Sequence, residues 1–173
     1  MLSGRLAGLG AVAGAITAGI GVACGDDHML DAFYIAPGLV FGLIVGGALW
    51  RDRLLPGVRW LGYLVAAGLA NAVAVLLAVR GVDPVLRLVG NEHVAVALIG
   101  LVAGAVGGGL LGVASRWLIG ARRWGWAAGV GGLFGVLLPV LVEGGALGAL
   151  AFYVLWQAGY AAVIPATLAG RRR

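Results

Sequence analysis

Residues 99–114, IGLVAGAVGGGLLGVA, carry a glycine at every fourth position of an apolar run, at Gly100, Gly104, Gly108 and Gly112. Residues four apart lie on one face of a helix, so this spacing predicts a nearly straight groove without side chains. In water each glycine would cost the helix roughly 1 kcal/mol relative to alanine. In a bilayer, unsatisfied backbone groups are so costly that the helix forms anyway, and the groove admits a neighbouring backbone. We therefore expect residues 94–117 to form a central membrane-spanning helix.

The whole chain has the composition of a polytopic membrane protein. Of its 173 residues, 62% are hydrophobic, 11% are charged and 33 are glycine, and the mean hydropathy is +1.05. A soluble domain of this length could not bury so much apolar surface. Six spans of about 20 residues each would use most of the chain. The remaining loops leave no room for a soluble catalytic or nucleic-acid-binding domain.

Apolar runs between charged or turn-forming loops predict an all-α, six-helix transmembrane bundle that forms one domain, residues 1–173. The expected spans are residues 6–23, 33–50, 60–79, 94–117, 124–142 and 147–168. Asp83 and Pro84 are typical of the start of a short interfacial helix, which Gly90 would end. Small residues at four-residue spacing predict close helix packing in other spans too, at Gly10, Gly14, Gly38, Gly42 and Gly46.

The two halves of the chain share short patterns. Residues 10–15, GAVAGA, resemble residues 100–105, GLVAGA, and an FG pair occurs at residues 41–42 and again at 134–135. Three spans per half would give a 3+3 inverted repeat, a plan found in many secondary transporters. Pro37 and Pro139 do not follow this plan, and Gly/Ala-rich helices also match one another by chance.

The charged residues are sorted by side of the membrane. If the spans alternate, one side has a net charge of +9 and the other −4, which together give the formal charge of +5. The positive-inside rule then places both termini in the cytoplasm of a bacterial cell, with the chain in the cell (inner) membrane. Because the arginines follow topology, we exclude nucleic acid as a partner. Membrane lipid, further copies of the chain or a partner membrane subunit are expected instead.

The chain lacks the usual signatures of enzymes and cofactor sites. Both histidines lie in predicted outer loops, and the sequence contains neither a GK[ST] phosphate-binding loop nor an HExxH motif. Cys24 is the only cysteine, which excludes an intrachain disulfide and a CxxC site. We expect neither enzymatic activity nor a cofactor.

Carboxylates and imidazoles gather in the predicted outer loops, and these groups suit a divalent metal. The candidate ligands are Asp26, Asp27, His28, Glu92 and His93. The stretch GDDHML at residues 25–30 resembles the G-x-D-H stretch of small nickel/cobalt permeases, although the histidine-proline segment of those permeases is missing upstream. A simpler interpretation, which we favour, is that acidic outer loops merely satisfy the membrane topology.

Asn71 and Gln157 are the only carboxamides within the predicted spans, and each lies near the centre of its helix. Lipid offers no hydrogen-bond partners, so both must face the interior of the bundle. They could hold helices together by bonding to each other, to a carbonyl group or to Thr17. Alternatively, they could line one cavity that binds a neutral ligand, with Glu143 near its outer mouth.

The first span offers a further hint about function. Its ridge of Ala7, Ala11 and Ala15 resembles the alanine ridge by which substrate-capture subunits of energy-coupling-factor importers dock their membrane partner. We expect a small integral membrane transport protein, either a permease or a substrate-binding importer subunit, for a small solute. The alternative is a non-catalytic scaffold or accessory subunit of a larger membrane complex. A polar midplane cavity would favour transport, and a solid core would favour the scaffold.

Overall fold

The structure, a computed structural model, describes residues 2–168, with the side chains of residues 25–33 and 141–142 outside the description. Every regular element within residues 2–168 is a helix, so the expected all-α fold is confirmed. Five segments of this range are long and apolar enough to cross a membrane: Leu2–Cys24, Tyr34–Arg51, Arg59–Val89, Glu92–Ile119 and Gly145–Thr167. This is the architecture of a multi-pass membrane protein.

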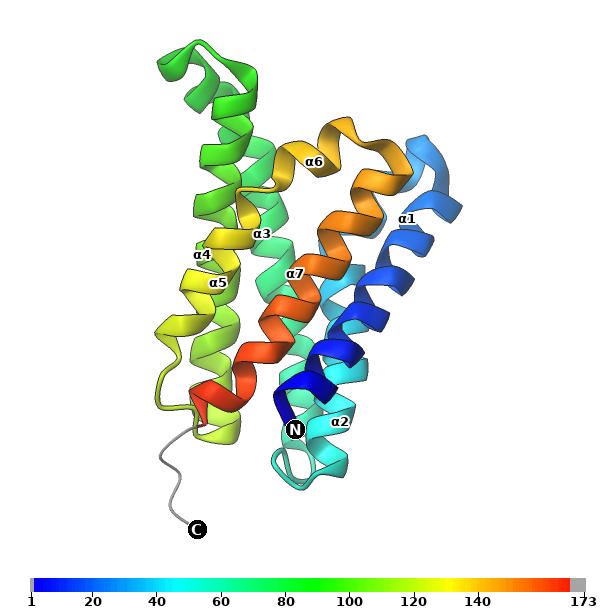
Figure 1. The fold of residues 1–173 in the computed structure, drawn as a ribbon, viewed down its shortest axis with the longest axis vertical. Coiled ribbons are helices and arrows are strands. Elements are labelled where there is room, and N and C mark those ends of the chain that lie inside the picture. The colour runs from blue at the N-terminus through cyan, green and yellow to red at the C-terminus, as the bar shows by residue number, and fades with distance from the viewer. Residues whose placement is uncertain (1, 169–173) are drawn as a thin grey trace.

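The first two of these segments belong to helix α1 (Leu2–Phe41) and its continuation through the π-helix η1 (Gly42–Gly46) and α2 (Gly47–Arg51). The amide nitrogen of Gln157 donates both to the hydroxyl of Thr17, at 3.2 Å, and to the carbonyl of Pro37, at 3.3 Å. A straight helix would hold these two acceptor residues about 30 Å apart. The chain therefore reverses direction between them, and Figure 1 shows the dark-blue and light-blue parts of α1 side by side.

Helices α3 (Arg59–Val89) and α4 (Glu92–Ile119) form the next hairpin. Gly90 ends α3 in the left-handed conformation, with φ of 68°. The expected interfacial helix starting at Asp83 is wrong, because α3 continues through Pro84 to Val89. Gly81 lies directly against the side chain of Ile99, so this part of α3 packs on α4. Near this exposed helix end, water can satisfy the carbonyl group that Pro84 leaves without a donor.

The expected fifth span, residues 124–142, is broken into α5 (Gly125–Gly135) and α6 (Leu138–Glu143). Pro139 lies in the first turn of α6. Within a continuous helix its ring would clash with the carbonyl of Gly135, and it has no N–H to donate. The 11 residues of α5 reach only about 16 Å, roughly half the hydrocarbon core. Six full-length spans are therefore not found in residues 2–168.

Helix α6 lies across one end of the bundle, and α7 (Gly145–Thr167) returns to the other (Figure 1). We call the end with α6 and the α3–α4 turn the top, and the opposite end the base. The start of α1 lies at the base, where Arg5 pairs with Asp52 at 3.0 Å. The end of α7 lies there too, and its Thr167 carbonyl accepts from the N–H of Arg122 at 2.9 Å. The 3+3 inverted repeat stays a prediction. It pairs the second expected span with the fifth, and the structure has a continuous helical segment at Tyr34–Arg51 but a break between α5 and α6.

The glycine groove of α4 faces α5. A Cβ added to Gly100, Gly104 or Gly108 would collide with a backbone carbonyl oxygen of α5, and one added to Gly112 would lie 2.5 Å from the Trp124 carbonyl. Helix α5 meets α4 with glycines of its own, since a Cβ on Gly131 would strike the carbonyl of Gly104. The two backbones are thus in direct contact.

Glycines of α1 and η1 make similar close contacts. A Cβ on Gly10 or Gly14 would strike the backbone of α7, and one on Gly38 would strike that of α3. Gly42 and Gly46 face α3 as well, where an added Cβ would lie 2.9 Å from Leu64 and Tyr63 atoms. Helix α7 therefore packs closely on the first part of α1, and α3 on the second.

Candidate solute-binding site

A small cavity lies in the middle of the bundle, between α1, α3, α4 and α7. The space open to the centre of a water-sized sphere is about 30 Å³. A water molecule needs roughly 10–15 Å³ of such space, so the cavity has room for about two. None of the lining residues is charged; they are Pro37, Gly38, Phe41, Ala67, Ala70, Asn71, Gly107, Gly108, Leu111, Trp156, Gln157 and Tyr160.

Glycines and a distorted helix shape the walls of this cavity. Gly38, Gly107 and Gly108 have no side chains, so the backbones of α1 and α4 form the cavity wall at these positions. The second part of α1 carries Pro37 and leads into the π-helix Gly42–Gly46. Such π turns are rare, and they occur frequently at functional sites.

Gln157 is the most informative residue of the cavity. Its side chain is 2% exposed, and its Nε2 donates to Thr17 Oγ1 at 3.2 Å and to the Pro37 carbonyl at 3.3 Å. Because a backbone carbonyl can only accept, the amide nitrogen must be the atom that faces Pro37. The carbonyl oxygen Oε1 is then buried without a hydrogen-bond partner in the described part of the chain. A buried acceptor in this state calls for water or a ligand.

Two further polar side chains face the same space. Asn71 is 4% exposed and donates from Nδ2 to the carbonyl of Tyr34 at 2.9 Å. Trp156 stacks on Phe152 with a centroid separation of 5.9 Å. Its Nε1 is buried, and no partner for it lies among the described residues. Both unpartnered atoms therefore belong to side chains that line the cavity.

The predicted ligand-binding residues separate into two groups. Asn71 and Gln157 line one cavity, and Thr17 lies behind it, buried and bonded to Gln157. Both carboxamides also bond to neighbouring helices, as expected if they hold the helices together, but that role leaves Oε1 of Gln157 unexplained. Glu143 is not among the lining residues and lies instead at the top, at the end of α6.

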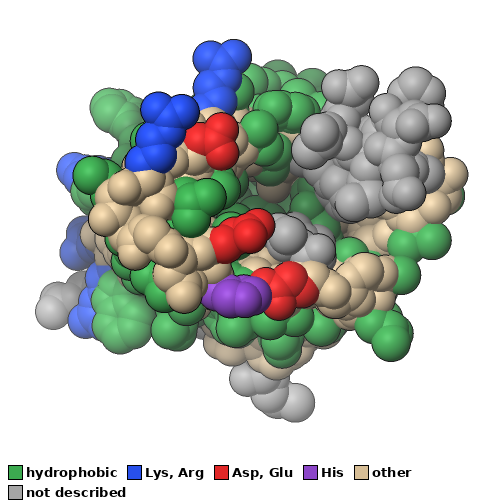
Figure 2. Space-filling view, turned by 90° about the horizontal axis from the view of Figure 1, so that it is seen from above, with side chains coloured by type: hydrophobic (Ala, Val, Ile, Leu, Met, Phe, Trp, Pro, Cys, Tyr) green, Lys and Arg blue, Asp and Glu red, His purple; other side chains and the backbone are tan. Residues whose placement is uncertain are grey.

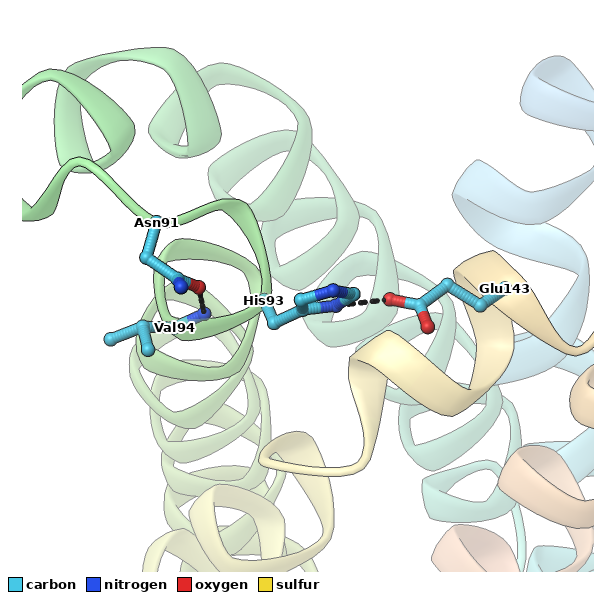
Figure 3. Close-up of polar contacts among 4 residues, drawn as sticks. All are labelled: Asn91, His93, Val94 and Glu143. Carbon is cyan, nitrogen blue, oxygen red and sulfur yellow. Dashed lines mark hydrogen bonds and ion pairs between the residues drawn. The ribbon is translucent and has the colours of Figure 1, made fainter.

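Figure 2 shows acidic side chains and a histidine gathered on the top of the molecule. His93, at the start of α4, points across to Glu143, and its Nδ1 lies 2.6 Å from Oε1 (Figure 3). The side chains are 71% and 55% exposed, so water screens this contact. Beside it, the Asn91 side chain caps α4 by accepting from the N–H of Val94 at 3.1 Å (Figure 3).

The predicted metal ligands are only partly placed. The side chains of Asp26, Asp27 and His28 lie outside the described residues. Glu92 is exposed, and His93 is paired with Glu143. Among the side chains that the structure describes, no group of three His, Cys, Asp or Glu residues could hold a metal ion. The metal site stays a prediction.

Of the lining side chains that carry a polar atom, sequence reasoning missed two, Trp156 and Tyr160. Tyr160 lies three residues after Gln157, on the same face of α7, so helical spacing could have found it. Trp156 is the one tryptophan that lies in the middle of an expected span, whereas the other five lie at or near span ends. Its position in the middle of a helix was the available signal.

No protein-family model, no curated protein and no solved structure matches this chain. The geometry of the cavity is therefore the basis on which a function can be inferred.

Proposed function

We propose that this chain is a small integral membrane transport protein that binds a small uncharged polar solute in the midplane cavity. The observation that carries the proposal is the buried Gln157 Oε1, which has no partner among the described residues and belongs to a side chain that lines the cavity together with Asn71. An acceptor without a partner is costly inside a membrane protein unless a bound molecule satisfies it.

The cavity also restricts the class of solute. With no charged lining residue, nothing in it would compensate the desolvation of an ion. A molecule with one donor and one acceptor would match Gln157 Oε1 and Trp156 Nε1. The volume of about 30 Å³ suits water-sized molecules, and a solute of urea size would require the walls to move apart.

Flux measurements on the purified protein in liposomes test this proposal. Water, urea and glycerol serve as probes, and stopped-flow light scattering follows the volume change. We expect at least one probe to enter faster than it enters empty liposomes. Gln157→Leu and Asn71→Leu should bring its rate down to that of empty liposomes, because each removes a polar group from the cavity wall.

The matched control is Leu155→Ile, since Leu155 is 50% exposed on the same helix as Gln157 and does not line the cavity. Its flux should equal that of the unmodified chain. Size-exclusion profiles and unfolding temperatures verify that the Asn71→Leu and Gln157→Leu variants remain folded. If no probe crosses faster than through lipid, or if folded cavity variants keep full flux, the proposal is wrong.

A second candidate, a non-catalytic accessory subunit of a larger membrane complex, is favoured by the outward face of α1. A Cβ added to Gly4, Gly8 or Gly19 would meet nothing within 4 Å. Such a face could admit another backbone closely, as small-residue faces do in membranes. The liposome assay separates the two functions, because an accessory subunit would give no flux by itself.

We further propose that the chain lies in the cell (inner) membrane with its base in the cytoplasm. Seven of the described arginines lie at or near the base: Arg5, Arg51, Arg53, Arg59, Arg116, Arg122 and Arg123. The acidic residues Asp83, Glu92 and Glu143 lie toward the top. The positive-inside rule supports this orientation.

A further inference from the structure

A second, smaller cavity lies closer to the base, between α4, α5 and α7. The volume that the centre of a water-sized sphere can occupy there is about 10 Å³, which is close to what one water molecule requires. Its lining residues include Gly112, Ser115, Trp124, Tyr160, Ile164 and Thr167. The midplane cavity and this basal cavity therefore share one side chain, that of Tyr160.

Both cavities follow the same pair of helices. On α7, Gln157, Tyr160, Ile164 and Thr167 are spaced by three or four residues and lie on one face. On α4, Gly108 lines the midplane cavity, and Gly112 lines the basal cavity one turn further on. The two spaces are thus consecutive segments of one gap between α4 and α7, which we call the seam.

Tyr160 lies between the two spaces and borders both of them. Its side chain is 6% exposed, and its ring packs edge-on against Phe41 at a centroid distance of 5.6 Å. The hydroxyl donates to the backbone carbonyl of Gly108 at 3.2 Å. A single hydrogen bond therefore ties the tip of this side chain to α4.

The basal cavity has hydrogen-bonding groups of its own. The Ser115 hydroxyl donates to the Leu111 carbonyl at 2.8 Å, and that of Thr167 donates to the Ile164 carbonyl at 2.6 Å. A hydroxyl oxygen keeps acceptor capacity after its hydrogen is used. Both oxygens can therefore accept a hydrogen bond from a small polar molecule in this space.

We infer that Tyr160 gates a route for the solute between two sites in series, the midplane site at Gln157 and a basal site at Ser115 and Thr167. This inference rests on the proposed transport function. Swinging the ring out of the seam breaks the bond to Gly108 and joins the two cavities. Several weak sites along a pathway let a solute enter without being held too tightly to leave.

A thiol-accessibility experiment tests the gate without requiring any transport. In a Cys24→Ser background, Ala70→Cys places a thiol on the wall of the midplane cavity. Hydrogen peroxide, an uncharged molecule little larger than water, is the probe, and the thiols that remain are counted with a fluorescent maleimide after denaturation. The rate of thiol oxidation is compared in chains with Tyr160, Tyr160→Phe and Tyr160→Ala.

We expect Tyr160→Ala to raise the modification rate at position 70 by tenfold or more. A tenfold increase corresponds to a decrease of roughly 1.4 kcal/mol in the free energy of opening the route. Tyr160→Phe keeps the ring and loses only the bond to Gly108, so its rate should rise about fivefold. Leu69→Cys, on the neighbouring outward position that is 56% exposed, should react equally in all three chains. Tyr160→Phe also keeps the test decisive if Tyr160→Ala does not fold.

If position 70 is modified no faster in any folded Tyr160 variant than in the chain with Tyr160, the proposed gate is wrong, whatever the liposome assay shows. If the rate rises as expected while liposomes show no flux, the gate stands and the proposed transport function fails. A rise at position 69 as large as that at position 70 would indicate general loosening and would also overturn the gate.

Discussion

At the scale of single residues, the effect of replacing a glycine depends on which atoms the new Cβ would contact. Gly104 of α4 faces the carbonyl of Gly131 so closely that a Cβ would collide with it. Gly129 of α5 faces open space, and a Cβ there would meet nothing within 4 Å. Both glycines lie inside membrane helices, so their intrinsic helix propensity is the same.

This contrast predicts opposite responses to one added methyl group. Gly104→Ala should lower the free energy of unfolding by about 1–3 kcal/mol, because it overpacks a backbone contact. Gly129→Ala should leave it unchanged or raise it by up to about 1 kcal/mol, because alanine is the better helix former. Thermal unfolding in detergent, followed by tryptophan fluorescence, measures both. Equal shifts of the same sign would mean that α4 and α5 do not touch as described.

At the scale of helices, the bundle departs from regular α-helix beside the midplane cavity. The π-helix Gly42–Gly46 follows the lining residues Pro37, Gly38 and Phe41. A π turn closes i→i+5 hydrogen bonds and so holds more residues than an α turn. Removing one residue from it can restore a regular helix without changing which faces lie inward on either side.

Deletion of Leu43 tests this interpretation, since Leu43 lies inside the π-helix and is 55% exposed. We expect the shortened chain to fold with an unfolding temperature equal to or above that of the full chain, because no buried side chain is lost. Deletion of Leu69, a similarly exposed leucine within the regular helix α3, is the control and should prevent folding by rotating half of that helix. Comparable losses from both deletions would contradict a localised π turn.

At the scale of the whole molecule, the distribution of charge supports the proposed orientation, with the base in the cytoplasm. The base carries most of the described arginines, and the top carries the described acidic side chains other than Asp52. Moving either set across a bilayer would be costly. The proposed orientation therefore rests on charges from the entire chain and not on any single loop.

Single-cysteine labelling in whole cells tests the orientation, with Cys24→Ser as background. Leu88→Cys, at an 85% exposed position toward the top, should react with a membrane-impermeant maleimide in intact cells. Val58→Cys, at a 78% exposed position in the base loop before α3, should react only after permeabilisation. The reverse pattern would place the base outside the cell.

The sequence by itself determined the all-helical class and the approximate position of the five long spans. Hydropathy is a local property of the chain, and a lipid environment leaves helix as the only way for one segment to satisfy its own backbone. The four-residue spacing of Gly100, Gly104 and Gly108 likewise predicted a close-packing face. The break between α5 and α6 was missed because average hydropathy is insensitive to Pro139, which cannot continue a helix.

Only the tertiary structure decided what the polar residues do. Asn71 and Gln157 come from α3 and α7, and whether they share a cavity depends on how each helix is rotated toward its neighbours. The same holds for Tyr160, which borders two cavities because α4 offers glycines opposite it. Such contacts join residues that are far apart in the chain, and their geometry depends on how all the helices pack together. That packing also paired His93 with Glu143, a contact that no local pattern in the sequence indicates.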